Sequence, residues 1–267
     1  MARSTQPKKR LDVLLVERGL VESRSLAQRL VMAGQVRVDG QMVLKPATAV
    51  PGGAHLEIDQ GPPFVSRGGE KLAAALQAFP VQAEGKVCAD VGASTGGFTD
   101  CLLQHSAARV YAIDVGKGIL HWKLRQDQRV IVMENTNARF IERLPEPVDL
   151  VTVDASFISL KVLLPVIHRW FATNRGEVIA LIKPQFEAGR AEVSRGDGVI
   201  RDSLVHRQVL QDVLAFARQA GFAVCGLERS PLLGPKGNVE FLAWLYLPPD
   251  QAPAATQIDL DQIVPCE

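Results

Sequence analysis

The chain has 267 residues, of which 47% are hydrophobic and 22% are charged, as is typical of a globular protein with a sizeable core. No run approaches the ~18 apolar residues that span a bilayer, and residues 1–10 are basic and polar, so neither a membrane helix nor an export signal is predicted. We therefore expect a cytoplasmic protein that does not contact membranes.

The cysteines form no CxxC pair and have no histidine at ligand spacing, which argues against a zinc site and a disulfide framework. No metal is expected. Three of the four cysteines are expected to be small core residues; the four are Cys88, Cys101, Cys225 and Cys266.

The charge of the chain is uneven. Residues 1–71 hold eleven Lys and Arg against seven Asp and Glu, whereas the net charge of the whole chain is only +1. A basic N-terminal part could contact polyanions, but an ordinary solvated surface explains the same charge equally well. Charge alone therefore does not assign a partner.

The first sixty residues are predicted to begin with two short helices. The leucines of residues 11–15 recur at helical spacing. Ser23 is placed to cap a second helix, in which Leu26 and Leu30 face inward and which Gly34 ends.

A hairpin is predicted next. Val36 and Val38 alternate with polar residues, Asp39-Gly40 is a strong two-residue turn signal, and residues 42–44 form the return strand. A further extended run covers residues 54–58, after the breaker sequence Pro-Gly-Gly. The predicted unit is therefore a compact α+β module.

The segment 60–64 is predicted to be a linker, because the consecutive prolines Pro62 and Pro63 cannot continue a helix or a central strand. We therefore expect two domains, at residues 8–62 and 63–250.

Beyond the linker, apolar runs alternate with helical patterns, which predicts an α/β fold with a Rossmann-like, mostly parallel sheet covered on both faces. The last two runs are close together, so the final strand is expected to be antiparallel, and the tail after Pro248 is expected to be loosely ordered. The seven predicted strands are 87–91, 110–113, 130–133, 150–153, 178–182, 223–227 and 241–247.

A glycine-rich turn, residues 90–99, joins the first of these strands directly to a helix. Ligands of open α/β sheets bind at this edge, and the acidic Asp114 follows the second strand, where it could bind a ribose. The pattern fits NAD or S-adenosylmethionine. S-adenosylmethionine is favoured because the loop is not GxGxxG, and because Asn135 and Asn137 could bind an adenine, although asparagines often only stabilise turns. The expected cofactor-binding residues are Asp90, Gly92, Ser94, Gly96, Gly97, Phe98, Asp114, Asn135, Asn137 and Asp154.

Four charged residues are predicted at the same edge: Lys71, Asp154, Lys183 and Glu240. Methyl transfer to a hydroxyl such as that of a ribose requires a base and good alignment. A lysine ammonium has a pKa near ~10.4, and a second cation nearby would lower it. Lys183 is our candidate base, with Lys71 as its cationic neighbour, Asp154 facing the transfer site and Glu240 positioning a lysine.

These segments resemble the hemolysin A (TlyA) family of ribosomal RNA 2′-O-methyltransferases, whose catalytic domain is similar to the FtsJ group. The resemblance extends from about residue 8 to about residue 248. The segments that carry it are residues 10–30, VSRGGEKL at 65–72, DVGASTGGFTD at 90–100, VDASFIS at 153–159 and IKPQFE at 182–187. One departure is Ser94, where many methyltransferases have glycine.

The resemblance implies a catalytic Lys-Asp-Lys-Glu tetrad at the four charged residues above. It also implies S-adenosylmethionine as cofactor, an N-terminal S4-type RNA-binding domain, and a cytidine ribose in ribosomal RNA or ribosomal subunits as substrate. The RNA-binding residues that it suggests are Arg10, Arg24, Arg29, Arg37, Lys45 and Arg67.

Three other readings stay open at this point. The protein could be a catalytically inactive RNA-binding or ribosome-assembly factor, although the intact tetrad argues against it. A membrane-active hemolysin, as the family name suggests, has no support in a membrane span or secretion signal. An NAD-dependent dehydrogenase would differ in its cofactor.

A monomer is expected, because an enzyme with its own recognition domain needs no partner chain.

Overall fold

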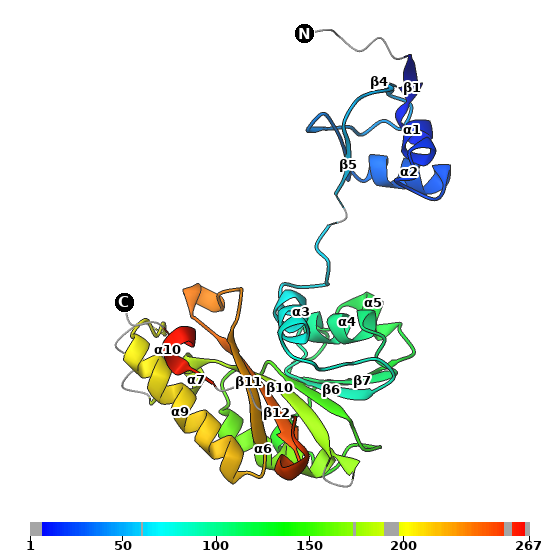
Figure 1. The fold of residues 1–267 in the computed structure, drawn as a ribbon. Coiled ribbons are helices and arrows are strands. Elements are labelled where there is room, and N and C mark those ends of the chain that lie inside the picture. Colours follow the sequence, from blue (N-terminus) through cyan, green and yellow to red (C-terminus); the bar gives the residue numbers. More distant parts are fainter. Residues whose placement is uncertain (1–6, 60, 173–174, 190–197, 254–257, 265–267) are drawn as a thin grey trace. The chain divides into compact units, whose positions relative to one another are not determined.

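The computed structural model describes residues 7–59, 61–172, 175–189, 198–253 and 258–264. The chain divides into two compact units, Met1–Pro63 and Phe64–Glu267 (Figure 1). Each unit has its own buried apolar cluster, as expected for two segments that bury their apolar faces separately.

The N-terminal unit combines two helices with short antiparallel strands. Strands pair in the order β3-β2-β5, and β1 pairs separately with β4. Its elements are β1 (Lys8–Arg10), α1 (Leu11–Glu17), α2 (Arg24–Met32), β2 (Val36–Val38), β3 (Gln41–Met42), β4 (Ala49–Pro51) and β5 (Leu56–Ile58).

The local signals in this unit explain its shape. The Ser23 hydroxyl accepts a hydrogen bond from the Leu26 amide at 3.3 Å and so caps α2, as predicted. The hairpin turn is also confirmed, with positive φ at both Asp39 and Gly40. As predicted, Leu26 and Leu30 pack against the apolar cluster of this unit, but they are only partly buried, and the fully buried residues of α2 are Ala27 and Val31.

Two strands of this unit were not predicted. The basic segment Lys8–Arg10 forms β1, whose partner is β4, a strand that includes the expected breaker Pro51. A proline is tolerated there because it stands at the end of a two-stranded pair, where no further ladder hydrogen bond is needed from it.

The second unit is built on a seven-stranded sheet in the order β11-β12-β10-β9-β6-β7-β8. All seven predicted strands are present. As expected, β12 runs antiparallel to both of its neighbours, β10 and β11, while β10, β9, β6, β7 and β8 pair in parallel. The strands are β6 (Val87–Val91), β7 (Arg109–Ile113), β8 (Val130–Met133), β9 (Leu150–Val153), β10 (Gly176–Ile182), β11 (Ala223–Arg229) and β12 (Phe241–Leu247).

Helices cover both faces of this sheet. The α-helices are α3 (Gly68–Ala78), α4 (Gly97–Gln104), α5 (Trp122–Arg125), α6 (Leu160–Ile167), α7 (Pro184–Glu187), α9 (Ser203–Gln219) and α10 (Leu260–Ile263). Short 3-10 turns are η1 (Ala138–Phe140), η2 (His168–Trp170), η4 (Pro235–Gly237) and η5 (Pro249–Gln251).

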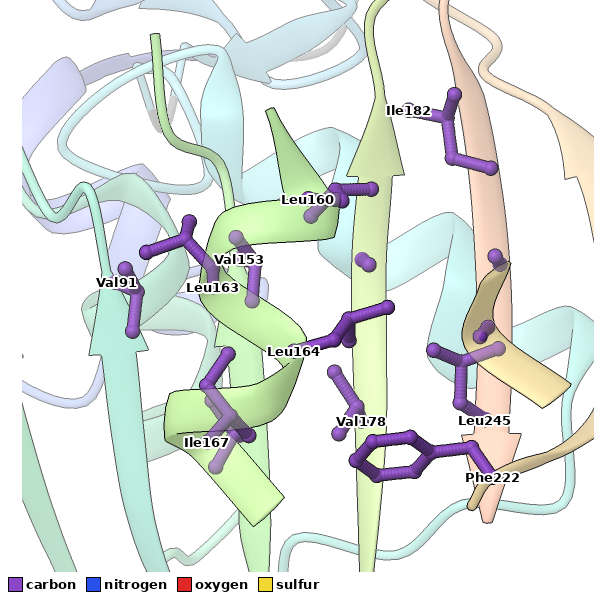
Figure 2. Packing of buried hydrophobic residues seen from close by; sticks show 14 of the residues in the cluster. Val91, Val153, Leu160, Leu163, Leu164, Ile167, Val178, Ile182, Phe222 and Leu245 are labelled. Atoms are coloured by element: carbon purple, nitrogen blue, oxygen red, sulfur yellow. The ribbon is translucent and has the colours of Figure 1, made fainter. Parts of the chain in front are cut away.

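The two faces of the sheet belong to two separate apolar clusters, because side chains alternate along each strand. One cluster packs α6 and α9 on the sheet, and the other packs α3 and α4. Figure 2 shows α6 lying on the first face, where Leu160, Leu163, Leu164 and Ile167 contact strand residues such as Val153. Continuous apolar strands are therefore explained by burial on both sides.

The segment after β12 is more structured than predicted. It contains α10, and Val264 beside it is buried in the main cluster. The Arg207 guanidinium holds this segment, since it pairs with Asp261 and donates to the Val264 carbonyl at 2.7 Å. As expected, Cys88, Cys101 and Cys225 are buried, while Cys266 lies outside the described residues.

The order of the strands fixes where a ligand can bind. From β6 the chain passes to β7 on one side, whereas β9 lies on the other side of β6. Such a reversal opens a crevice at the carboxyl ends of the central strands. Because β12 is antiparallel, its first residues reach the same edge as the last residues of its neighbours.

Candidate active site

Two adjoining cavities lie at this edge of the sheet. The first, of about 460 Å³, is lined by Lys71, Asp154, Lys183 and Glu240, and we call it the lysine cavity. The second, of about 450 Å³, includes Asp114 in its wall, and we call it the Asp114 cavity. They share the wall residues Gly92, Ser94, Asp154 and Ser156.

The glycine-rich loop is shaped by close packing within the protein. Gly92 has φ +86°, and a Cβ there would lie 2.7 Å from the Asp154 carbonyl oxygen. At Gly96, with φ +96°, a Cβ would lie 2.1 Å from the Leu124 side chain. Only glycine fits these positions. Gly97 and Phe98 line the lysine cavity, whereas Gly96 lies in the wall of neither cavity.

Asp90 does not lie where the sequence suggested. Its side chain is fully buried beneath the loop and lines neither cavity, so Asp90 is not placed to contact a cofactor directly. Its carboxylate accepts hydrogen bonds from the hydroxyls of Thr99, at 2.7 Å, and Thr152, at 3.2 Å. The Asp90 carboxylate therefore links α4 to β9 beneath the glycine-rich loop. Burial, supported by the negative charge of Asp154, raises the pKa of Asp90 to about 7.

The far end of the Asp114 cavity is formed by the residues after β7 and β8. Asp114 accepts hydrogen bonds from the amides of Ser94, at 2.8 Å, and Gly116, at 2.7 Å, which fix its carboxylate at the cavity wall. Asn137 lines the cavity and also caps η1 by accepting from the Arg139 amide at 3.2 Å. Asn135 has a left-handed backbone conformation with φ +52° and does not line the cavity. Its position therefore fits stabilisation of a turn and not adenine binding.

The four charged residues of the predicted tetrad come together as two lysine–carboxylate pairs. Lys183 Nζ lies 2.6 Å from Asp154 Oδ1 and also donates to the Asp154 carbonyl and the Ser156 hydroxyl, each at 3.2 Å. Lys71, on the first turns of α3, pairs with Glu240, which enters β12. Each lysine is therefore held by its own carboxylate. The tetrad adds no formal net charge when all four groups are ionised.

Glu240 is only 1% exposed, and its environment constrains it closely. One oxygen binds Lys71, while the other, Oε1, has no hydrogen-bond partner among the described residues. The backbone of Gly234 approaches this carboxylate so closely that a Cβ would lie 2.1 Å from Oε1. The loop before β12 therefore fits around the carboxylate of Glu240.

Several wall residues were not anticipated from the sequence. Ser156 lines both cavities and contacts Lys183, and the loop residues Leu233 to Lys236 close one side of the lysine cavity. Phe157, beside the Asp114 cavity, is 91% exposed with φ +63°, which is unusual for an aromatic residue. Ser156 and Phe157 belong to the segment 153–159, which carries part of the family resemblance, but a serine and an aromatic residue have no distinctive spacing signal.

The basic residues suggested for RNA binding differ in their surroundings. Arg10 and Arg24 both bind the buried carboxylate of Asp12: Arg10 through bonds of 3.0 and 2.9 Å, and Arg24 through one of 2.9 Å. Gln28 completes this group with a bond of 3.0 Å to the same carboxylate. These hydrogen bonds, first that from Arg10, hold the pKa of Asp12 well below its usual range.

The remaining four candidates are spread over both units. Arg29 is exposed on α2, Lys45 is exposed in a loop, and Arg37 donates to the Gly40 carbonyl at 3.5 Å in the hairpin. Arg67 belongs to the second unit, where it precedes α3 and lines the lysine cavity. The described residues contain no cluster of side chains suited to a metal ion and no helix long and apolar enough to cross a membrane.

A Rossmann-like sheet with two adjoining cavities at its carboxyl edge is compatible with a methyltransferase, and the comparison with known families identifies this class. Residues 64–247 match the family described as FtsJ-like methyltransferase, and residues 9–56 match the S4 domain.

Individual relatives narrow the class. The chain is 44% identical to the 16S/23S rRNA (cytidine-2′-O)-methyltransferase TlyA of Mycobacterium tuberculosis over 94% of both chains. It is 42% identical to Hemolysin A of Brachyspira hyodysenteriae, over 88% of this chain and 98% of that one. A solved structure of a Streptococcus thermophilus protein with a hemolysin designation is 43% identical, with a TM-score of 0.71 and coverage of 97% of this chain and 95% of that one. The chain therefore belongs to the TlyA (hemolysin A) family of FtsJ-like methyltransferases with an S4 domain.

Proposed function

We propose that this protein transfers a methyl group from S-adenosylmethionine to the 2′-hydroxyl of a cytidine ribose in ribosomal RNA. The observation that carries the proposal is the pair of adjoining cavities with Asp154 in their common wall, one cavity containing both lysine–carboxylate pairs. The ribosomal RNA and the cytidine come from the activity named for the M. tuberculosis relative.

The Asp114 cavity suits S-adenosylmethionine. Its acidic residue stands after β7, where a carboxylate can accept hydrogen bonds from both ribose hydroxyls of a nucleoside. Apolar Val115, Ala138 and Leu163 offer a surface for an adenine ring, with Asn137 beside them. Gly92, Ser94 and Asp154 would hold the amino-acid end, next to the lysine cavity. When bound, this cofactor supplies an activated methyl group on a positively charged sulfur.

The residues of the lysine cavity handle the proton. The ribose oxygen would bond to the methyl carbon as the carbon–sulfur bond breaks and a thioether leaves. The proton of the ribose hydroxyl would pass to the unprotonated form of Lys183, and Asp154, 2.6 Å from Nζ, would stabilise the ammonium so formed. Lys71, oriented by Glu240, faces the developing negative charge on the ribose oxygen. Ser156 fixes the position of Nζ by the hydrogen bond at 3.2 Å.

The S4 domain is proposed to hold the RNA. Arg24 and Arg29 lie on α2. Arg10 and Arg24 donate to the same carboxylate of Asp12, which holds these two arginines close together. Such residues contact phosphates and position the RNA rather than read its sequence. Arg67 extends the basic contacts to the lysine cavity itself.

The decisive experiment is incubation of the purified protein with methyl-labelled S-adenosylmethionine and unmodified bacterial ribosomal subunits. A 2′-O-methyl group blocks alkaline cleavage of the following bond, because it removes the attacking hydroxyl. We expect label in the RNA at an alkali-resistant bond next to a cytidine. Label on a base would overturn the ribose assignment.

A binding measurement separates the cofactor from the reaction. S-adenosylmethionine, and not NAD, is expected to raise the melting temperature, because a ligand that binds only the folded state stabilises it. Cofactor binding without any transfer to either subunit would favour the assembly-factor alternative. Stabilisation by NAD alone would favour a dehydrogenase.

A further inference from the structure

Another cavity, of about 280 Å³, is lined in part by Val239 and Phe241, the residues on either side of Glu240. Its wall includes two arginines from separate elements, Arg201 before α9 and Arg229 at the end of β11, together with Ser203, His206 and Phe241. We call it the arginine cavity. None of the residues assigned above to the cofactor or to the tetrad lines it.

The arginine cavity lies at the same edge of the sheet as the lysine cavity. Arg229 is the last residue of β11 and pairs with Phe241, which directly follows Glu240. The next residue, Ser230, donates its amide to the Glu240 carbonyl at 2.9 Å. An RNA strand whose ribose enters the lysine cavity therefore has the arginine cavity beside it, along the same edge.

The backbone around Arg201 is held on both sides. The Ile200 amide donates to Asn238 Oδ1 at 3.1 Å, and Nε2 of His206 lies 3.0 Å from the Ile200 carbonyl. On the other side, Asp202 caps α9 by accepting from the Leu204 amide at 2.8 Å. Arg201 is thus an exposed side chain on a fixed backbone, an arrangement that costs little further ordering when a ligand binds.

The two guanidinium groups have no acidic partner within the described part of the chain. Both arginines are exposed, and neither forms an ion pair or side-chain hydrogen bond with another described residue. Asp202, which caps α9, is the one acidic residue in the described wall of the cavity, so the two arginines leave that wall with a formal charge of +1. His206 adds no charge near neutral pH, because burial lowers its pKa. The wall is therefore positive and suited to a phosphate.

We propose that the arginine cavity binds a phosphodiester of the RNA strand that carries the target ribose. The inference rests on the proposed function and deepens it. It also answers a need of the site, because each tetrad lysine is neutralised by its own carboxylate and the tetrad gives little net attraction for a polyanion. Arg201 and Arg229 supply that attraction beside the reacting ribose.

The test compares the double variant Arg201→Ala/Arg229→Ala with the control Arg175→Ala/Arg218→Ala. The control arginines are also exposed, but they stand just before β10 and in the last turn of α9, at the opposite edge of the sheet. The measurements are KM and kcat for ribosomal subunits, RNA affinity at several salt concentrations, and melting temperature with S-adenosylmethionine.

For Arg201→Ala/Arg229→Ala we expect roughly a tenfold higher KM and a salt dependence of affinity reduced by about 1 to 2 in slope, because charged hydrogen bonds and counterion release are lost. The kcat value and the stabilisation by S-adenosylmethionine should stay as in the parent protein. Replacing both residues with lysine should restore the salt slope but only part of the affinity.

Equal KM and salt slope in the two double variants would overturn the proposal, as would a cavity that inorganic phosphate saturates without weakening RNA binding. These outcomes are distinct from failure of the proposed function. If the parent protein binds RNA but transfers no methyl group, the affinity and its salt slope still test the arginine cavity. If the parent methylates RNA and the variant binds it unchanged, only the arginine cavity is refuted.

Discussion

Lys183 Nζ lies 2.6 Å from Oδ1 of Asp154, and the same aspartate forms part of the wall of both the lysine cavity and the Asp114 cavity. The negative charge of Asp154 therefore acts on groups in both the lysine cavity and the Asp114 cavity. The proposed base and the proposed methyl donor therefore depend on one carboxylate.

The first prediction concerns Lys183. Lys183→Ala is expected to lower the methylation rate by about 10²-fold or more, since a positioned base contributes at least that much. Stabilisation by S-adenosylmethionine should persist, because Lys183 does not line the Asp114 cavity. Lys86→Ala is the matched control: Lys86 also pairs with a carboxylate, that of Glu177, but at the amino edge of the sheet. A Lys183→Ala protein as active as the control would remove Lys183 from the role of base.

The second prediction uses Gly234. Its φ of −70° suits alanine, but a Cβ would lie 2.1 Å from Glu240 Oε1, so Gly234→Ala should displace the flexible carboxylate from Lys71. We expect kcat to fall about tenfold or more, and the melting temperature to fall as well, because the buried carboxylate would lose its lysine partner. Gly189→Ala serves as control, because nothing lies within 4 Å of its added Cβ. Unchanged kcat in Gly234→Ala would show that the geometry of this pair is not critical.

The third prediction concerns Asp12. Its carboxylate is buried under two arginines and Gln28, so Asp12→Asn should reduce the local stability of α1 and α2 by about 1–3 kcal/mol at pH 7. Because the folded-state pKa of Asp12 is lowered, this stabilisation is present above the ordinary pKa and is lost only as the pH falls below it.

Hydrogen exchange of the helix amides measures the effect of Asp12→Asn. Glu17→Gln is the control, since Glu17 forms a half-exposed pair with Lys9 in the same unit and should change exchange by less than about 1 kcal/mol. If the two variants exchanged alike, the group around Asp12 would not be a main source of stability in this unit.

The fourth prediction concerns pH. The pKa of Asp90 is raised from 3.8 to about 7, so the folded state holds this proton more tightly than the unfolded chain. The stabilisation by that proton is complete below about pH 4 and is lost as the pH rises through 7. Asp90→Asn removes this loss, which amounts to about 4 kcal/mol because one pKa unit corresponds to about 1.4 kcal/mol.

Urea unfolding of the parent protein and of Asp90→Asn at pH 5 and pH 8 tests this sign. The free energy of unfolding of the variant, relative to the parent, should be higher at pH 8 than at pH 5. A relative stability that is unchanged between these pH values would mean that Asp90 is already ionised in the folded protein at both.

The strands of the catalytic unit were predictable, because strands buried on both faces appear as unbroken apolar runs, and β6, β8, β9 and β12 have the predicted bounds. The edge of the sheet at which the four charged residues meet was also predictable, because parallel strands end at the same edge. The two lysine–carboxylate pairs were not predictable, because Lys71 and Glu240 are 169 positions apart and no local pattern shows which lysine pairs with which carboxylate.

Other differences have local causes. Asp90 has the sequence position of a ligand-contacting acid, and only the packing of Thr99 and Thr152 against it reveals a buried support. The strand Lys8–Arg10 has no apolar alternation to reveal it and depends on β4, some forty residues later. Arg201 and Arg229 belong to separate elements, so no motif joins them.

Because β12 is antiparallel, changes to the methyl-acceptor side of the site can be made separately from changes to the methyl-donor side. The hairpin of β11 and β12 brings Arg229, the Gly234 loop and Glu240 to the catalytic edge as one continuous piece of chain. The walls of the Asp114 cavity come from β6, β7 and the segments after β8 and β9. Exchanging the hairpin between relatives should therefore transfer preference for the methyl acceptor, while use of the methyl donor stays with the recipient.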